Sequence, residues 1–135
     1  MTGHWITLTA VDGHALRAWL ALPPQGSGPG LVLLHEMVGL NAFARDMAAR
    51  YAEEGYVTVV PDLYARQARD VELDYDATGL ARAAALRAGL VDTAALTDID
   101  AARAALDAEP ACRGRAAVIG FSMGGRLALL AAARG

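Results

Sequence analysis

The sequence predicts an α/β fold, in which helices cover a mostly parallel sheet. Three apolar, strand-like runs at residues 31–35, 56–60 and 115–119 alternate with longer segments whose apolar residues recur at helical spacing. Turn signals near the N-terminus indicate an antiparallel hairpin ahead of these runs. The chain has 135 residues, enough for one domain at most.

The N-terminal hairpin is predicted at residues 5–10 and 15–22. Its first run alternates large side chains with small or polar ones, as a half-buried strand does. Asp12-Gly13 is a two-residue turn signal between the two runs. Residues 23–29, rich in Pro, Gly and Ser, are expected to form a surface loop.

A strand–helix–strand unit follows. Residues 31–35 form a continuous apolar run that suits a central parallel strand covered on both faces. Asn41 is a predicted N-cap for a helix that runs to about Glu54, with Gly55 just beyond its C-terminus. Residues 56–60 form the next strand, so a right-handed parallel crossover is expected.

The second part of the chain predicts two more helices and one more strand. The polar segment 64–75 is expected to be an irregular excursion above the sheet. Helices are predicted over 79–90 and about 94–108, the second with an inner face of Ala95, Ile99, Ala102 and Leu106. A strand at 115–119 then leads to good helix formers at 125–133. This order of elements is that of the first half of an α/β-hydrolase fold.

Residues 120–124 read Gly-Phe-Ser-Met-Gly and match the G-x-S-x-G pattern of a nucleophile elbow. The strand before it and the helix after it are the context that this pattern requires. Gly120 and Gly124 allow a sharp turn and a close approach of strand and helix. We therefore predict that Ser122 is a nucleophile, activated by a histidine that lies elsewhere. The alternative is an ordinary Gly-Ser turn in a strand–helix connection.

Residues 35–39, His-Glu-Met-Val-Gly, follow the central strand at the sheet edge where α/β proteins bind ligands. The second histidine of an H-E-x-x-H zinc site is missing, so a metalloprotease is excluded. An oxyanion loop fits better, with the backbone N–H groups of Met37 and Met123 as donors. His35 is expected to structure this loop rather than act as the base. Glu36 is either a functional carboxylate or a solvated one.

Four further residues are of interest for a functional role because of their position: Asp62, Tyr64 and Arg66, which follow the next strand, and Cys112, the single cysteine. Asp62 is expected to cap or bridge its turn, whereas Tyr64 and Arg66 could reach a substrate. Cys112, in a polar loop before the last strand and with no histidine nearby in sequence, is expected to be unreactive.

Four stretches together resemble the dienelactone hydrolase family of α/β-hydrolases: residues 35–41, 52–57, 61–66 and 120–125. The resemblance extends over essentially the whole chain from residue 31. It implies that Ser122 stands at the nucleophile position and that Glu36 is the active-site glutamate that interacts with the nucleophile. It also implies that Met37 and Met123 supply the oxyanion amides.

The resemblance further implies an arginine near the nucleophile and the substrate carboxylate. Arg82 is the best match, and Arg87 is the alternative. Dienelactone hydrolases proper carry cysteine at the elbow, whereas this chain has serine, so a broader carboxylester or lactone hydrolase is expected. No cofactor and no metal ion is expected.

The predicted function is hydrolysis of a small-molecule ester or lactone through an acyl-enzyme on Ser122. In this architecture the acid and the histidine of the triad follow the serine, so they are expected beyond residue 135. Residues 1–135 are accordingly expected to be a single partial domain, truncated after the elbow and inactive alone. The competing hypothesis is a non-catalytic or truncated unit with a binding role or no independent role.

The charge and the apolar pattern of the chain argue against nucleic acids and membranes as partners. The net charge is −3 and the pI is about 5.5, which does not suggest nucleic-acid binding. No apolar run reaches the roughly 18 residues of a membrane span, and the N-terminus lacks the pattern of a signal peptide. A cytoplasmic protein is therefore expected, and its oligomeric state is left open.

Overall fold

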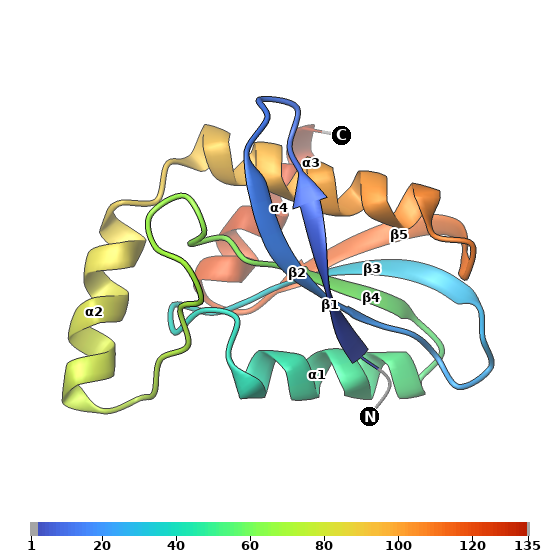
Figure 1. Cartoon of the computed structure of the whole chain (residues 1–135), viewed down its shortest axis with the longest axis horizontal. Helices are drawn as coiled ribbons and strands as arrows, with labels where there is room; N and C mark the ends of the chain where they lie inside the picture. The colour runs from blue at the N-terminus through green and yellow to red at the C-terminus, as the bar shows by residue number, and fades with distance from the viewer. Residues whose placement is uncertain (1–2, 135) are drawn as a thin grey trace.

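The computed structural model describes residues 3–134, which form one five-stranded sheet flanked by helices (Figure 1). The strand order is β1-β2-β4-β3-β5. β3, β4 and β5 run parallel, whereas β2 pairs antiparallel with both β1 and β4. The strands are β1 (Gly3–Thr9), β2 (Ala15–Ala21), β3 (Gly28–Leu34), β4 (Val57–Pro61) and β5 (Cys112–Gly120). The predicted α/β class and N-terminal hairpin are confirmed.

The helices are α1 (Ala42–Glu53), α2 (Ala77–Ala88), α3 (Asp92–Ala108) and α4 (Met123–Arg134). In Figure 1, α1 lies on one face of the sheet, and α3 and α4 lie on the other. α2 stands apart from both faces, beyond the end of the sheet where β3 and β4 finish (Figure 1). α2 therefore lies at the carboxyl edge of the parallel strands, where the predicted site residues Glu36 and Ser122 are expected.

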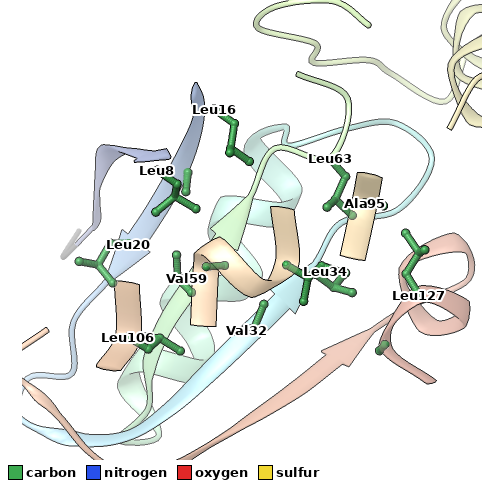
Figure 2. Packing of buried hydrophobic residues seen from close by; sticks show 14 of the residues in the cluster. Leu8, Leu16, Leu20, Val32, Leu34, Val59, Leu63, Ala95, Leu106 and Leu127 are labelled. Atoms are coloured by element: carbon green, nitrogen blue, oxygen red, sulfur yellow. The ribbon is translucent and has the colours of Figure 1, made fainter. Parts of the chain in front are cut away.

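Alternating side chains of the parallel strands fill two separate cores. Val32 and Leu34 pack toward α3 and α4, whereas Leu33 between them packs toward α1. Figure 2 shows the first core, in which Leu8 of the hairpin and Leu127 of α4 meet the central strands. Burial on both faces explains why the central strands are continuously apolar in sequence.

Local capping signals set the helix boundaries. The Asn41 side chain accepts a hydrogen bond from the N–H of Ala44 at 3.1 Å, which fixes the start of α1. At its end Gly55 has φ +106, and Tyr56 N–H donates to the Tyr51 carbonyl, as in a Schellman motif. The predicted bounds of this helix are confirmed. α2 begins two residues earlier than predicted because a side chain of the preceding turn, Asp76, caps it.

Two details of the sheet differ from prediction. The hairpin has a three-residue loop rather than a two-residue turn, because Ala10 N–H pairs with the His14 carbonyl and Gly13 takes the left-handed position, with φ +88. β3 begins at Gly28, inside the predicted loop. Pro29 is tolerated there because the pairing with β5 is irregular at this point, so no ladder hydrogen bond is lost.

Asp62 and Arg66 are structural residues. Asp62 accepts hydrogen bonds from Arg17 Nε at 2.8 Å and from Tyr64 N–H at 3.0 Å, so it bridges its turn as predicted. The interpretation of Arg66 as a substrate residue is wrong. Its guanidinium is held by Asp98 at 2.8 Å and Asp12 at 2.7 Å.

Replacing Arg66 by glutamine is expected to destabilise the fold by about 2–3 kcal/mol, because it leaves the Asp98 carboxylate buried without a cation. The Asp98 side chain is 1% exposed. The matched control is Asp12→Asn, which removes the solvent-exposed partner of the same guanidinium and should change stability little. Urea unfolding of both variants checks this, and equal losses would contradict it.

Candidate active site

Ser122 occupies a strained turn between β5 and α4. Its φ is +56, and among residues 3–134 only Asp70 is another non-glycine residue with positive φ. β5 ends at Gly120 and α4 begins at Met123, so the turn is as short as a nucleophile elbow requires. The Ser122 side chain is exposed. Strain of this kind is typical of functional turns that present one side chain to a ligand.

Glycine at positions 120 and 124 permits this turn. A Cβ at Gly124 would lie 2.6 Å from the carbonyl oxygen of Leu34 and 2.8 Å from that of His35. A Cβ at Gly120 would collide with the backbone of Gly124. The N-terminus of α4 therefore packs directly against the end of β3, at a distance that no side chain allows.

The strand register brings Ser122 and Glu36 to the same edge. Leu34 of β3 pairs with Gly120 of β5 in a parallel ladder, and each candidate residue follows two positions later. Both therefore lie past the carboxyl ends of adjacent parallel strands, where open α/β sheets bind ligands. The structure thus has both residues at the carboxyl edge of the sheet, as predicted.

His35 holds the backbone of the loop that follows β3. Its Nδ1 lies 2.7 Å from the Glu36 carbonyl oxygen, and its Nε2 accepts the Leu63 N–H at 3.0 Å. The acceptor role of Nε2 places the proton on Nδ1, so the ring is neutral and donates to Glu36. Gly39 N–H donates to the same carbonyl at 3.1 Å. Because the peptide group is planar and trans, pinning this carbonyl orients the Met37 N–H in the opposite direction.

The Glu36 carboxylate has a partner that sequence patterns did not reveal. Tyr75 donates its hydroxyl to Glu36 Oε2 at 2.5 Å. This hydrogen bond, ahead of partial burial, raises the pKa of Tyr75 to about 12. Glu36 also lines a pocket with Phe43 of α1 and Phe121 of the elbow. A carboxylate residue thus lines a mostly apolar pocket whose wall includes Phe121, the residue before Ser122.

Residues 16–135 match the family model described as the dienelactone hydrolase family. The chain belongs to this family. It is 34% identical over 131 residues to the carboxymethylenebutenolidase of Pseudomonas putida, covering 96% of this chain and 56% of that protein. The chain thus spans about half the length of the curated relatives it matches.

Solved structures agree with the family assignment. The dienelactone hydrolase-like promiscuous phosphotriesterase P91 from metagenomic libraries superposes with a TM-score of 0.69 at 28% identity, covering 98% of this chain and 54% of that one. The α/β-hydrolase GrgF from Penicillium sp. sh18 has a TM-score of 0.74 at 22% identity, covering 100% and 43%. The fold is that of an α/β-hydrolase, from the N-terminal hairpin through the turn at Ser122.

Arg82 and Arg87, the two candidates for binding the substrate carboxylate, are both exposed on α2. This helix docks at the site through Leu86, which packs with Tyr64 and Met123. Burial raises the pKa of Tyr64 to about 12, and the charge of Arg87 partly opposes this rise. Arg87 is thus close enough to influence the site electrostatically, whereas Arg82 lies more than one turn earlier on the same helix.

Tyr64 and Cys112 both lie outside any substrate position. The hypothesis that Tyr64 reaches a substrate is wrong, because its side chain is fully buried. Cys112 begins β5, at the opposite end of that strand from Ser122. Burial, then the charges of Asp107 and Glu109, raise the pKa of its thiol, which disfavours the reactive thiolate. This supports the prediction that it is unreactive.

Within residues 3–134, no group of three or more His, Cys, Asp or Glu side chains could hold a metal ion. None of the helices in that range is both long and apolar enough to cross a membrane.

His35 makes stability depend on pH. Burial lowers its pKa from the ordinary value of 6.5; the Glu36 carbonyl and the charge of Asp62 oppose this shift, and Arg17 reinforces it. Below pH 6.5 the unfolded chain binds a proton that the folded protein does not bind. Stability is therefore expected to fall by up to about 1.4 kcal/mol per pH unit, until the folded-state pKa is reached.

Urea unfolding between pH 7.5 and 5.5 measures this slope. The matched variant is His35→Gln, which removes this imidazole and keeps the other two histidines of the chain. Its slope should be smaller than that of the wild type over this range. Identical slopes would show that His35 is not held neutral in the folded protein.

Proposed function

We propose that this protein, at its full length, hydrolyses carboxylic esters or lactones through an acyl-enzyme on Ser122. The observation that supports this most is the exposed serine at φ +56, at the same carboxyl edge of the parallel strands as Glu36. Relatives named carboxymethylenebutenolidase support a hydrolase role. Serine in place of cysteine favours a broader range of esters and lactones than the dienelactone alone.

The proposed first step is attack of Ser122 Oγ on the carbonyl carbon of the substrate. Its proton passes to a histidine, which we place with the triad acid beyond residue 135. The N–H groups of Met37 and Met123 donate to the resulting oxyanion. Collapse of the tetrahedral intermediate expels the alcohol, which takes the proton from the histidine. Water then attacks the acyl-enzyme, releases the carboxylic acid and restores Ser122.

Two charged residues complete the proposal. Glu36 contacts the nucleophile region from the loop after β3, where its carboxylate orients the serine hydroxyl rather than controlling a thiol. Arg82 binds an anionic group of the substrate, with Arg87 as the alternative donor on the same helix. The charge of Arg87 acts on the pKa of Tyr64. Separate Arg82→Ala and Arg87→Ala variants distinguish the two arginines, because only loss of the one that binds substrate should raise KM.

The test is steady-state hydrolysis of p-nitrophenyl acetate by the full-length protein. Turnover preceded by a stoichiometric burst of nitrophenol is expected, because an acyl-enzyme accumulates. Residues 1–135 alone should show neither, since Ser122 would have no histidine to accept its proton. A folded full-length protein without turnover on aryl esters or lactones would support the non-catalytic alternative.

A further inference from the structure

We propose that Tyr64 is a positioning residue, which holds the two oxyanion-hole residues in their working arrangement through its buried hydroxyl. This inference rests on the proposed function. Its basis is one juxtaposition: the Tyr64 hydroxyl reaches both Met37 and Met123, the residues whose amides are proposed to stabilise the oxyanion.

The two contacts come from different strands of the sheet. The hydroxyl of Tyr64, which follows β4, donates to the Met37 carbonyl oxygen at 2.8 Å. The same hydroxyl lies 3.3 Å from Met123 Sδ. Met37 follows β3 and Met123 follows β5, so one hydroxyl connects the segments after three parallel strands. The carbonyl is the stronger acceptor, and the sulfur packs against the hydroxyl as a weak acceptor.

Tyr64 is itself held rigidly. Its backbone N–H donates to Asp62 Oδ1 at 3.0 Å, and Asp62 is fixed in turn by Arg17. Its carbonyl accepts hydrogen bonds from the N–H groups of Gln67 and Ala68. Its ring lies 5.2 Å from the His35 ring, centroid to centroid. The hydroxyl therefore has little freedom to follow a movement of Met37 or Met123.

Both peptide groups that flank Met37 are pinned. The Glu36 carbonyl accepts from His35, and the Met37 carbonyl accepts from Tyr64. With both planes fixed, the direction of the Met37 N–H is fixed as well. An oxyanion donor must lie about 2.7–3.1 Å from the developing charge, so a small displacement lowers the rate of the chemical step more than it weakens substrate binding.

The test is Tyr64→Phe in the full-length protein, which keeps the ring and removes the hydroxyl. With p-nitrophenyl acetate, kcat is expected to fall about tenfold while KM stays within about twofold. The affinity for phenylboronic acid, which forms a tetrahedral adduct with the serine, should fall by a similar factor. A purely structural role of the hydroxyl would not lower kcat and boronate affinity while leaving KM unchanged.

The matched control is Thr58→Val. Thr58 is fully buried in β4, and its hydroxyl donates to the Tyr56 carbonyl at 3.3 Å, away from the candidate site. Both variants should lower the melting temperature by a similar small amount, but only Tyr64→Phe should lower kcat and boronate affinity. Wild-type kcat in a folded Tyr64→Phe protein would overturn the proposal.

Two further variants separate the possible failures. If Tyr64→Phe does not fold, Met123→Leu removes the sulfur contact but keeps the amide and the Tyr64–Met37 hydrogen bond. A lower kcat supports the proposal, and an unchanged kcat overturns the claim that Tyr64 holds both residues. Ser122→Ala tests the proposed function separately. If Ser122→Ala is inactive while Tyr64→Phe keeps full activity, the positioning role alone is wrong.

Discussion

Replacing Ser122 by alanine in the full-length protein should reduce kcat for p-nitrophenyl acetate by about a million-fold, leaving essentially no activity above background. The substitution removes the hydroxyl oxygen that is proposed to form the acyl-enzyme, and alanine offers no group in its place. Thermal melting should change little because the side chain is exposed. The φ of +56 strains alanine and serine alike.

The matched control for this prediction is Cys112→Ala. It removes the single cysteine of the 135 residues, a residue type that acts as the covalent nucleophile in many enzymes. Because Cys112 lies at the far end of β5, kcat should stay within about twofold of the wild type. A large loss in Cys112→Ala, with activity kept in Ser122→Ala, would reverse the assignment of the nucleophile.

Replacing Gly124 by alanine should be strongly destabilising, by about 3 kcal/mol, and should also remove most of the activity. The new Cβ would meet two carbonyl oxygens at the end of β3 at 2.6 and 2.8 Å. Neither oxygen belongs to a flexible side chain, so α4 must move away from β3. That movement separates Met123 from Met37, and the two proposed oxyanion donors no longer converge.

Gly125→Ala is the control one residue away, on the same helix. Both substitutions gain the same helix propensity, up to about 1 kcal/mol. The nearest atom to a Cβ at Gly125 is the Gly120 carbonyl oxygen at 3.1 Å, which a shift of a few tenths of an ångström relieves. Its stability should stay within about 1 kcal/mol of the wild type by urea unfolding. Equal losses at both positions would show that helix packing at Gly124 is not specially close.

Local signals in the sequence were sufficient for most of the fold. The N-cap of Asn41 and the left-handed Gly55 are interactions between neighbours in sequence, so the bounds of α1 could be predicted closely. The start of β3 could not. Pro29 reads as a loop residue, and only the irregular pairing with β5, more than eighty residues later, makes a strand possible there.

In the candidate site, too, some features could be predicted from the sequence and others depend on contacts between distant residues. The positions of Ser122 and Glu36 follow from a motif and from the rule that parallel strands end at one edge. The contact of Tyr75 with Glu36 spans 39 positions in sequence. That of Tyr64 with Met123 spans 59. No spacing rule covers such pairs, so these two tyrosines were missed as partners.

The prediction for Arg66 failed for a related reason. An arginine beside a predicted ligand-binding edge suggested a substrate contact. In the sequence its partner Asp98 resembles any other polar residue of α3, and only the folded chain brings the two side chains within 2.8 Å. Sequence reasoning identified the residues that follow strands, but it could not tell which of them point inward.

Covalent labelling of the full-length protein with a fluorophosphonate tests the central claim most directly. Such a probe forms a bond with an activated serine, and trypsin then releases residues 116–126 as one peptide that contains Ser122. The account predicts one label per folded protein, located on Ser122 and absent from Ser27, the other serine of the 135 residues. A folded protein that hydrolyses esters but carries the label on another residue, or carries none, would contradict it.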